Sequence, residues 1–395
     1  MIDYGKVLPA RITDIPKSGI RKYFDMITPD MTDVISLTVG QPDFVTPWHI
    51  REAGIQSLET GKTFYTANAG LEELRIEINK YMTRRFDLSY DPRSELIVTV
   101  GGSEAIDIAM RATLDIDDEV IIPTPSFVCY EPLARMVGAK PVILETYFED
   151  EFRVDPNKLR SLITDKTKMI VLPFPNNPTG AIMTREDLEE IADIVRDTNI
   201  VILSDEIYAE MTYGNKHCSI ASIEGMKERT IVVNGFSKAF AMTGWRLGWV
   251  CAPAEITAQM LKIHQYEIMS SPTTSQFAAI SALRNGDDDI AYMTSEYDRR
   301  RTIIYEKLLS MGIESFEPKG AFYIFPKISQ FGLTGEEFCS ELLKRYHVAI
   351  VPGEAFGKCG AGFARISYAY SINHIIEGLD RMERFIDDIK NGKIK

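Results

Sequence analysis

Short apolar runs alternate with amphipathic helical patterns along most of the chain, from Pro47 to about Asn285. This alternation is typical of a mostly parallel sheet with helices on both faces, because each strand is then buried on both sides. We therefore predict an α/β fold whose large domain has a mostly parallel seven-stranded sheet covered by helices. The predicted strands are LIVTV (96–100), VIIP (120–123), PVIL (141–144), MIVLP (169–173), IVILS (200–204), IVVNGF (231–236) and LGWVCA (247–252).

Three helix starts between these runs carry recognisable capping residues. Ser103 precedes the helical pattern EAIDIAMRATL, and Asp155 is followed by Pro156 at the first helical position. Thr184 precedes REDLEEIADIVRDT, with Asp187 three residues later, which is a weakened form of the capping box. We expect helices to begin at these three points.

After Asn285 the pattern changes to that of a smaller α+β domain. Helices are predicted at 288–310, 335–346 and 372–390, and the strand-like runs FYIFP, VAIVP and FARISYA lie between them. The first forty-odd residues form a weakly periodic arm that could pack against this domain. The predicted parts are therefore the arm with part of the small domain (1–46), the large domain (47–285) and the small C-terminal domain (286–395).

Acidic residues outnumber basic ones by 57 to 44, which gives a formal net charge of −13. Nucleic acids and anionic membranes recruit basic surfaces, so neither is expected as a partner. The cysteines form no CxxC pair and the histidines no HExxH pair, so we predict neither a disulfide framework nor a metal site. The N-terminus has no basic head before an apolar run, and no apolar run approaches about eighteen residues. We therefore expect a cytoplasmic protein.

Two motifs follow predicted strands, where α/β proteins place their active sites. Ser237 and Lys238 follow IVVNGF and open the run SKAFAMTGWRLGW, in which Arg246 lies between two glycines. Asp205 follows the strand IVILS, and Tyr208 comes three residues later. Each motif alone also has a purely structural interpretation. A Ser-Lys pair usually lies on the solvated surface, and an aspartate after a strand can cap a helix.

Two further motifs are rich in turn residues. TVGGSEAI (99–106) combines a strand, a glycine turn and a helix start, so the N–H groups of Gly102, Ser103 and Glu104 would point at an anion. PFPNNPTG (173–180) is typical of a turn, because Asn and Pro favour turns and glycine supplies an adaptable backbone. A turn without any function remains the structural alternative for both.

These motifs together resemble one family. SK followed by GxRxG is similar to the cofactor-lysine pattern of the class I/II aminotransferases, the fold type I enzymes that use pyridoxal 5'-phosphate (PLP). The resemblance runs from the arm to the last predicted strand, which is nearly the whole chain. It implies a PLP-dependent aminotransferase that moves an amino group from an L-amino acid to a 2-oxo acid by a ping-pong mechanism.

The resemblance also implies the catalytic residues. Lys238 would carry PLP as a Schiff base and, once freed by the substrate amine, shuttle the proton from the substrate Cα. Asp205 would pair with the protonated pyridine nitrogen, which the ring needs in order to disperse a carbanion. Tyr208 and Asn177 would hydrogen-bond the phenolic oxygen, and Asn177 would also help to hold the substrate carboxylate.

The same resemblance assigns residues to the phosphate and to the ring. Ser237 and Arg246 would bind the phosphate together with the N–H groups of the 99–106 turn. Phe127, in PTPSFVCYEP, matches the aromatic residue that stacks on the pyridine ring, although the family more often has Tyr or Trp there. Tyr65, in FYTANAGLEELR, matches the tyrosine that reaches the phosphate of the neighbouring subunit. A homodimer with shared active sites is therefore expected.

Two residues are implied for the substrate carboxylate. Arg365, in GFARISYA, matches the arginine that grips the α-carboxylate as a planar fork, and a buried arginine in a strand is rare without a partner. Gly40, in TVGQPDF, matches the glycine whose backbone approaches the same carboxylate. The runs PKSGIRKYFD and ISLTVGQPDFVTPWHI are most similar to broad-specificity bacterial aminotransferases, which act on aromatic amino acids, aspartate, alanine or N-acetyl-diaminopimelate.

The amino donor stays open. Some bacterial aspartate aminotransferases have a lysine where this chain has Ser103, which weakens the assignment of aspartate. Arg21 and Lys22 could offer a cation to a distal carboxylate, or they are solvated surface charges.

Parts of the sequence are also similar to motifs of other enzyme classes. GFSKA and GGSEA are similar to the GxSxG elbow of serine hydrolases, but both lack the final glycine. No GxGxxG or GxxxxGK[ST] motif occurs, so nucleotide-binding folds lose their main support. Carbon–sulfur β-lyases, α-oxoamine synthases and aminocyclopropane-carboxylate synthases share the same cofactor residues. A β-lyase therefore remains the main alternative.

Overall fold

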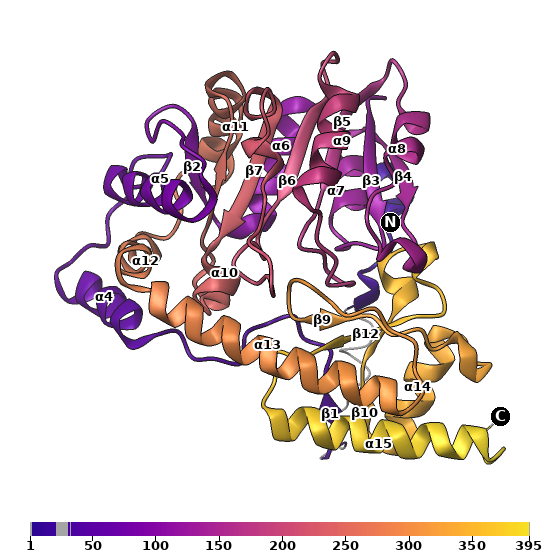
Figure 1. Ribbon diagram of the computed structural model, residues 1–395. Coiled ribbons are helices and arrows are strands. Elements are labelled where there is room, and N and C mark those ends of the chain that lie inside the picture. Colours follow the sequence, from indigo (N-terminus) through magenta and orange to yellow (C-terminus); the bar gives the residue numbers. More distant parts are fainter. Residues whose placement is uncertain (1, 21–30, 32, 395) are drawn as a thin grey trace.

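The computed structural model describes residues 2–20, 31 and 33–394, which form a large sheet with its helices and a smaller α+β unit (Figure 1). The large sheet has the strand order β2-β8-β7-β6-β5-β3-β4. Strand β8 runs antiparallel to both neighbours, and the other paired strands are parallel. The predicted mostly parallel seven-stranded sheet is therefore confirmed. Its strands are β2 Leu96–Thr99, β3 Glu119–Thr124, β4 Lys140–Glu145, β5 Thr167–Leu172, β6 Val201–Asp205, β7 Thr230–Gly235 and β8 Gly248–Cys251.

Successive side chains of each strand pack on opposite faces of the sheet. In β3, for example, Val120 and Ile122 join a core cluster with α6, α7 and α11, whereas Ile121 joins another with α8 and α9. Both faces are thus buried, which explains the uninterrupted apolar runs. The helices around the sheet are α4 Trp48–Glu59, α5 Glu72–Phe86, α6 Gly101–Thr113, α7 Tyr130–Val137, α8 Pro156–Leu162, α9 Arg185–Val195, α10 Phe236–Ala239, α11 Ala254–Glu267 and α12 Thr273–Asn285.

Two of the three predicted helix starts are confirmed, and one lies earlier than expected. Asp155 is the N-cap of α8, and the side chain of Thr184 caps α9 in a complete capping box. Helix α6 begins at Gly101 instead of Ser103. Gly101 has a φ of +76°, and a Cβ there would lie 2.7 Å from Nη2 of Arg246, so a glycine is required at this turn.

The smaller unit lies below the large sheet in the view of Figure 1 and combines helices with short strands. An antiparallel sheet has the order β11-β12-β9, and β1 (Ile35–Ser36), from the predicted arm, pairs in parallel with β10 (Val348–Ala349). The strands are shorter than the apolar runs suggested. The other elements of this part are β9 Tyr323–Ile324, β11 Val351–Pro352, β12 Ala364–Ser367, α13 Asp287–Ser310, α14 Gly335–Tyr346 and α15 Ile372–Lys390, and the arm adds α1 Tyr4–Val7 and α2 Ala10–Thr13.

The predicted domain boundaries stay predictions. Both fall between elements, since the boundary at 46 lies between β1 and α4 and that at 285 between α12 and α13.

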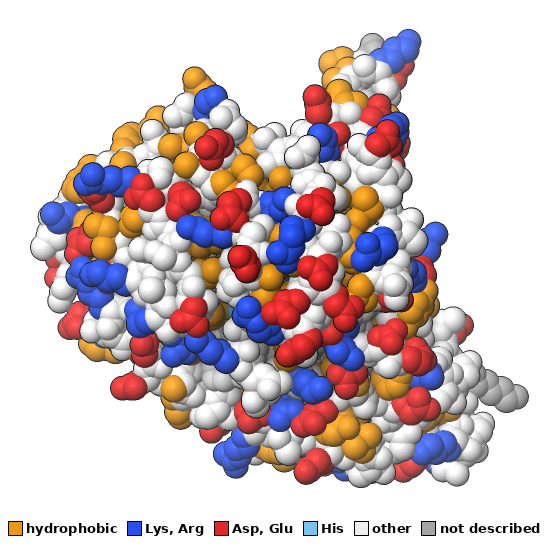
Figure 2. All heavy atoms as spheres, turned by 45° about the horizontal axis from the view of Figure 1, so that its top comes forward, with side chains coloured by type: hydrophobic (Ala, Val, Ile, Leu, Met, Phe, Trp, Pro, Cys, Tyr) orange, Lys and Arg blue, Asp and Glu red, His pale blue; other side chains and the backbone are white. Residues whose placement is uncertain are grey.

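Acidic and basic side chains are interspersed over the face in Figure 2. None of the described helices is long and apolar enough to cross a membrane.

One glycine of the SKAFAMTGWRLGW run lies where three segments meet. A Cβ on Gly248, at the start of β8, would lie 2.9 Å from the carbonyl carbon of Gly101. It would also lie 3.0 Å from both the carbonyl oxygen of Asn234 and the nitrogen of Gly102. These are backbone atoms, so no side-chain rotation relieves the contacts. Gly248 therefore lets β8 pack directly against the first turn of α6.

Gly248→Ala should lower the thermal midpoint of the protein, because the added methyl group forces β7, β8 and α6 apart. Overpacking of this kind typically costs about 1–3 kcal/mol. Gly244→Ala, in the same run, is the matched control, since no atom lies within 4 Å of its Cβ position. Circular dichroism melts of both variants make the comparison. A wild-type midpoint for Gly248→Ala would contradict this account of the packing.

Candidate active site

A cavity of about 500 Å³ lies at the carboxyl ends of the large-sheet strands and is also lined by Tyr323 and Arg365 of the smaller unit. This is where open α/β sheets bind their ligands. Of the predicted site residues, those that line the cavity are Gly40, Gly102, Ser103, Phe127, Asn177, Asp205, Tyr208, Ser237, Lys238, Arg246 and Arg365. Segments far apart in the sequence are thus brought to one place.

Lys238 enters the cavity from α10, the short helix that follows β7. Its Nζ donates a hydrogen bond of 2.6 Å to the carbonyl oxygen of Gly40. Burial lowers the pKa of Lys238 to about 8, helped by the positive charges of Arg365 and Arg246 and opposed by Asp205. About half of this amine is therefore neutral near pH 8, and the neutral amine is the form that attacks a carbonyl group.

Asp205 is the last residue of β6, and its carboxylate is buried. The hydroxyl of Tyr130 donates to Oδ2 at 2.7 Å, and the N–H of Ile207 donates to Oδ1 at 3.2 Å. Burial raises the pKa of Asp205, although these two hydrogen bonds oppose the shift. The result is a fixed, poorly solvated carboxylate, which favours a positive charge on a ligand beside it.

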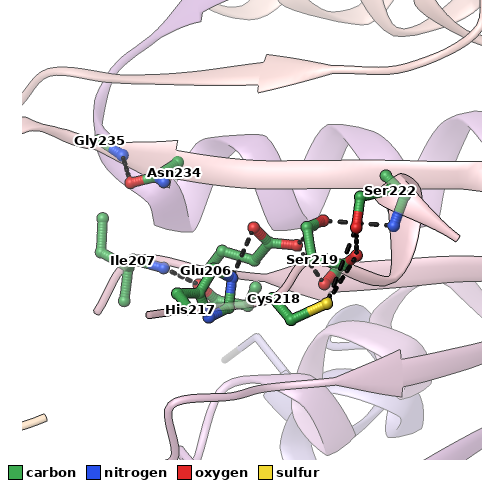
Figure 3. Close-up of polar contacts among 11 residues, drawn as sticks. Glu206, Ile207, His217, Cys218, Ser219, Ser222, Asn234 and Gly235 are labelled. Carbon is green, nitrogen blue, oxygen red and sulfur yellow. Dashed lines mark hydrogen bonds and ion pairs between the residues drawn. The ribbon is translucent and has the colours of Figure 1, made fainter. Parts of the chain in front are cut away.

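The next residue, Glu206, is fully buried and does not line the cavity. Its carboxylate accepts hydrogen bonds from the hydroxyls of Ser204 at 2.8 Å and Ser219 at 2.5 Å. The other oxygen lies 2.9 Å from Nε2 of His217 (Figure 3). This network anchors the turn after β6, so it fixes the backbone from which Asp205 projects.

Arg365, on β12, is a buried cation whose hydrogen-bond donors are only partly satisfied. Its Nη1 donates to Oδ1 of Asn177 at 2.9 Å, and its Nη2 donates to the carbonyl oxygen of Thr38. The guanidinium lies 4.6 Å from the ring centre of Tyr323 and 4.9 Å from that of Phe356. Nε is buried and has no hydrogen-bond partner among the described residues. Such an orphaned donor fits a site for an acidic ligand.

Tyr208 lines the cavity, and its hydroxyl is 2.8 Å from that of Tyr323. Burial raises the pKa of Tyr208 well above its usual value. The group therefore remains a protonated phenol, able to donate a hydrogen bond, across the physiological range.

The first turn of α6 and Arg246 form an anion-binding corner. The N-cap Val100 supplies no side-chain hydrogen bond to the helix start, and Gly102 and Ser103 line the cavity. Arg246 has a left-handed φ of +50°, and its Nη1 donates to the carbonyl oxygen of Thr243 at 3.1 Å. A guanidinium beside free N–H groups at the positive end of a helix fits a phosphate.

Two predicted residues lie outside the cavity. The side chain of Glu104 accepts a hydrogen bond from the N–H of Val100 and lies 2.5 Å from Nδ1 of His264, so it faces away from the site. The predicted role of its backbone N–H stays a prediction. Tyr65 is 79% exposed and does not reach the cavity of its own chain. Arg21 and Lys22 lie outside the described residues.

Sequence reasoning missed two tyrosines that line the cavity. Tyr130 and Tyr323 lie in the runs PTPSFVCYEP and FYIFP, which were interpreted only for Phe127 and for a strand. Their partners, Asp205 and Tyr208, are 75 and 115 residues away in the sequence. A hydroxyl pair between such distant segments leaves no periodic signal.

Two arrangements typical of other enzyme classes are not found among the described residues. No histidine is among the described residues that line the cavity, so the histidine base of a Ser-His-Asp triad is not found beside Ser103 or Ser237. Within the described ranges, no group of histidine, cysteine and acidic residues could hold a metal ion.

Comparisons with known proteins agree with this geometry. The model of the family described as Aminotransferase class I and II matches residues 32–381. The probable N-acetyl-LL-diaminopimelate aminotransferase of Bacillus subtilis (strain 168) is 44% identical over 96% of this chain and 96% of its own length. The aspartate aminotransferase of Pyrococcus abyssi is 45% identical over 96% of this chain and 98% of its own length.

Solved structures show the same relationship. The crystal structure of an aromatic aminotransferase from Pyrococcus horikoshii OT3 superposes with a TM-score of 0.89 at 44% identity. The match covers 94% of this chain and 99% of that structure. With a family match over most of its length and relatives of this similarity, the chain belongs to the class I and II aminotransferases.

Proposed function

We propose that the cavity around Lys238 is the site at which this PLP-dependent aminotransferase moves an amino group from an L-amino acid to a 2-oxo acid. One observation carries the proposal. The same cavity holds an amine of lowered pKa, a buried carboxylate at Asp205 and a buried guanidinium at Arg365 with a free Nε. These groups match a ligand that combines an aldehyde, a cationic ring and acidic groups.

The residues present fit PLP. Arg246, Ser237 and the first turn of α6 would hold its phosphate, while Asp205 would face the ring nitrogen. Tyr208 and Asn177 would donate to the phenolic oxygen, with Phe127 against the ring. When bound, PLP supplies an electron sink for the charge that remains when a substrate loses its α-proton.

Lys238 would act twice in this chemistry. Its neutral amine would hold the cofactor between turnovers and, once released, would take the proton from the substrate Cα and return it during transfer. Arg365 binds the α-carboxylate through the donor that the protein leaves free. Amino acids and 2-oxo acids both carry this carboxylate, so one arginine serves both halves of a ping-pong reaction.

The dimer is part of the proposal. Phe64, Tyr65 and Tyr266 are 52%, 79% and 87% exposed. Their segments lie together, because Nδ2 of Asn68 donates to the carbonyl oxygen of Met269 at 2.7 Å. A second copy of the chain would cover this apolar surface, and Tyr65 would then reach the partner's phosphate site.

A cytoplasmic location stays a prediction.

The cavity supports amino donors with uncharged side chains. Among the described lining residues, the cations are Lys238, Arg246 and Arg365, and each already has a proposed role. None is left for a side-chain carboxylate. The relatives compared above are named for three different substrates, so their names alone do not decide the donor.

The first prediction for the site concerns cofactor attachment. Formation of the visible absorption of bound PLP from apo-protein should accelerate as the pH rises through about 8, because only the neutral Lys238 amine attacks the aldehyde. Borohydride reduction and peptide mapping should place the adduct on Lys238. Lys238→Arg, which retains a positive charge, should form no reducible adduct. An adduct on another lysine would overturn the assignment.

The second prediction concerns reaction type and donor. Given an L-amino acid alone, the holoenzyme should convert its cofactor to the pyridoxamine form once per site, and an oxo acid should restore it. L-Phenylalanine should react at least about tenfold faster than L-aspartate, because an unpaired carboxylate in the pocket costs more than about 1.4 kcal/mol. Absorbance changes in stopped flow measure both rates.

A β-lyase would behave differently in the same assay. It would release pyruvate continuously from cystathionine without an oxo acid, and this result without any half-reaction would refute transamination. A faster reaction with L-aspartate would refute the donor assignment, and Arg21→Ala and Lys22→Ala would then show whether the arm supplies the cation.

The third prediction concerns the shared site. Tyr65→Phe should weaken PLP retention roughly ten- to a hundredfold, because a hydrogen bond to a charged group contributes about 1.5–3 kcal/mol. A mixed dimer of one Lys238→Ala subunit and one Tyr65→Phe subunit places both lesions in one site. It should retain about half the wild-type activity per dimer. If Tyr65 serves its own subunit, both sites are damaged and the activity falls well below half.

A further inference from the structure

Tyr323 connects three of the proposed site residues, although no role for it follows from the motifs. It lies on β9, is almost completely buried and lines the cavity. Its hydroxyl is 2.8 Å from that of Tyr208, and its ring lies under the guanidinium of Arg365 at 4.6 Å. A Cβ at Gly40 would lie 2.0 Å from its hydroxyl oxygen, so the Tyr323 side chain occupies the space that this glycine leaves free.

The segment that carries Tyr323 is held firmly. The N–H of Ala321 donates to the carbonyl oxygen of Met211 at 2.9 Å, and the hydroxyls of Tyr213 and Tyr368 both donate to the carbonyl oxygen of Ala321. Tyr323 also pairs with Ser367 in the ladder between β9 and β12. Its hydroxyl and ring are therefore fixed relative to the strand that carries Arg365.

The ring of Tyr323 limits how Arg365 can lie. The guanidinium carbon lies over the ring of Tyr323, at 4.6 Å from its centre, and over that of Phe356, at 4.9 Å. Aromatic faces attract a desolvated cation, and the planar guanidinium of arginine stacks on them. Since Nη1 is tied to Asn177, this stacking sets the direction of the free Nε.

The hydroxyl of Tyr323 limits how Tyr208 can donate. A phenol has one proton, so only one member of the Tyr208–Tyr323 pair donates to the other. When Tyr323 donates, the proton of Tyr208 is left for a ligand in the cavity, and Tyr208 becomes the stronger donor because hydrogen bonds in a chain polarise one another.

We propose that Tyr323 is a positioning residue for the reaction, whose hydroxyl donates to Tyr208 and whose ring holds the Arg365 guanidinium in the plane that receives a carboxylate. This inference rests on the proposed function, which assigns Tyr208 to the cofactor oxygen and Arg365 to the substrate. The hydroxyl of Tyr323 thus acts on the cofactor through Tyr208, and its ring acts on the substrate through Arg365. Different substitutions of Tyr323 can therefore test the two actions separately.

Other groups also act on Tyr208. Asp205 on β6, Arg365 on β12 and Lys238, whose Nζ lies 5.6 Å from the centre of the Tyr208 ring, all remain in the variants below. A change in titration on loss of the Tyr323 hydroxyl therefore reports the loss of that one donor.

The hydroxyl is tested by Tyr323→Phe in the holoenzyme, through the pH titration of the absorbance of the bound cofactor. Weaker donation by Tyr208 to the cofactor oxygen should raise the midpoint by roughly half to one pH unit, as for the loss of one hydrogen bond. Tyr208→Phe should itself raise the midpoint. Adding Tyr323→Phe to Tyr208→Phe should change nothing further, because the effect passes through Tyr208.

Tyr297→Phe is the matched control for loss of a buried hydroxyl. Tyr297 belongs to the same core cluster as Tyr323, and its hydroxyl has no hydrogen-bond partner among the described residues. Its titration midpoint should equal that of the wild type. An unshifted midpoint in Tyr323→Phe, or the same shift on top of Tyr208→Phe, would overturn the proposed action on Tyr208.

The ring is tested by Tyr323→Leu, which removes the stacking face. The KM values for L-phenylalanine and for its oxo-acid acceptor should both rise roughly tenfold or more, as expected for loss of a desolvated cation–π contact. Tyr323→Phe, which retains the ring, should leave both KM values within about twofold of the wild type. If Tyr323→Leu does not fold, Tyr323→Met replaces it. Unchanged KM values in the aliphatic variant would overturn the proposed action on Arg365.

The test separates this inference from the proposed function. Failure of the wild type to show any half-reaction would refute transamination. The titration of the bound cofactor would even then report whether Tyr323 acts through Tyr208.

Discussion

Burial of the Arg365 guanidinium imposes the strongest constraint on the site. A buried charge is costly unless its donors are satisfied, and here the partners are neutral: the amide of Asn177, the carbonyl of Thr38 and two aromatic rings. They satisfy part of the guanidinium without neutralising its charge. The remaining positive charge and the unpartnered Nε would favour the binding of an acidic ligand. The turn with Asn177, the segment before Gly40 and the strand pair β9–β12 must all meet around this one side chain.

The balance of charges in the cavity is opposite in sign to the net charge of the whole chain. The chain has a net charge of −13, yet Lys238, Arg246 and Arg365 face the single carboxylate of Asp205 among the described lining residues. The two guanidinium groups help to lower the pKa of Lys238, which makes its amine a nucleophile. They also attract anions. In the proposed function, one charge arrangement would therefore serve both the attack of the lysine on a carbonyl group and the binding of a phosphate and a carboxylate.

The sequence predicted the features that depend on local pattern. The seven strands of the large sheet appear within about a residue or two of their apolar runs, and the motifs at their ends supply most of the cavity wall. What it missed depends on contacts between distant segments. Tyr323 contacts Tyr208 and Tyr130 contacts Asp205, and no regular sequence spacing predicts either pair. The close approach of Arg246 to Gly101, at the start of α6, is also a tertiary effect.

The same distinction explains why the reaction is easier to infer than the substrate. The phosphate and the ring belong to the cofactor and the α-carboxylate to every amino acid that such an enzyme handles, so the residues proposed to bind them can be constant and stand in compact motifs. The side chain of the substrate would contact the other residues that line the cavity. In this chain these residues include Ser18 and Ile20 of the arm and Val128 after β3. Small and apolar groups of this kind fill space without directing charge, and they can change without disturbing Lys238, Asp205 or Arg365.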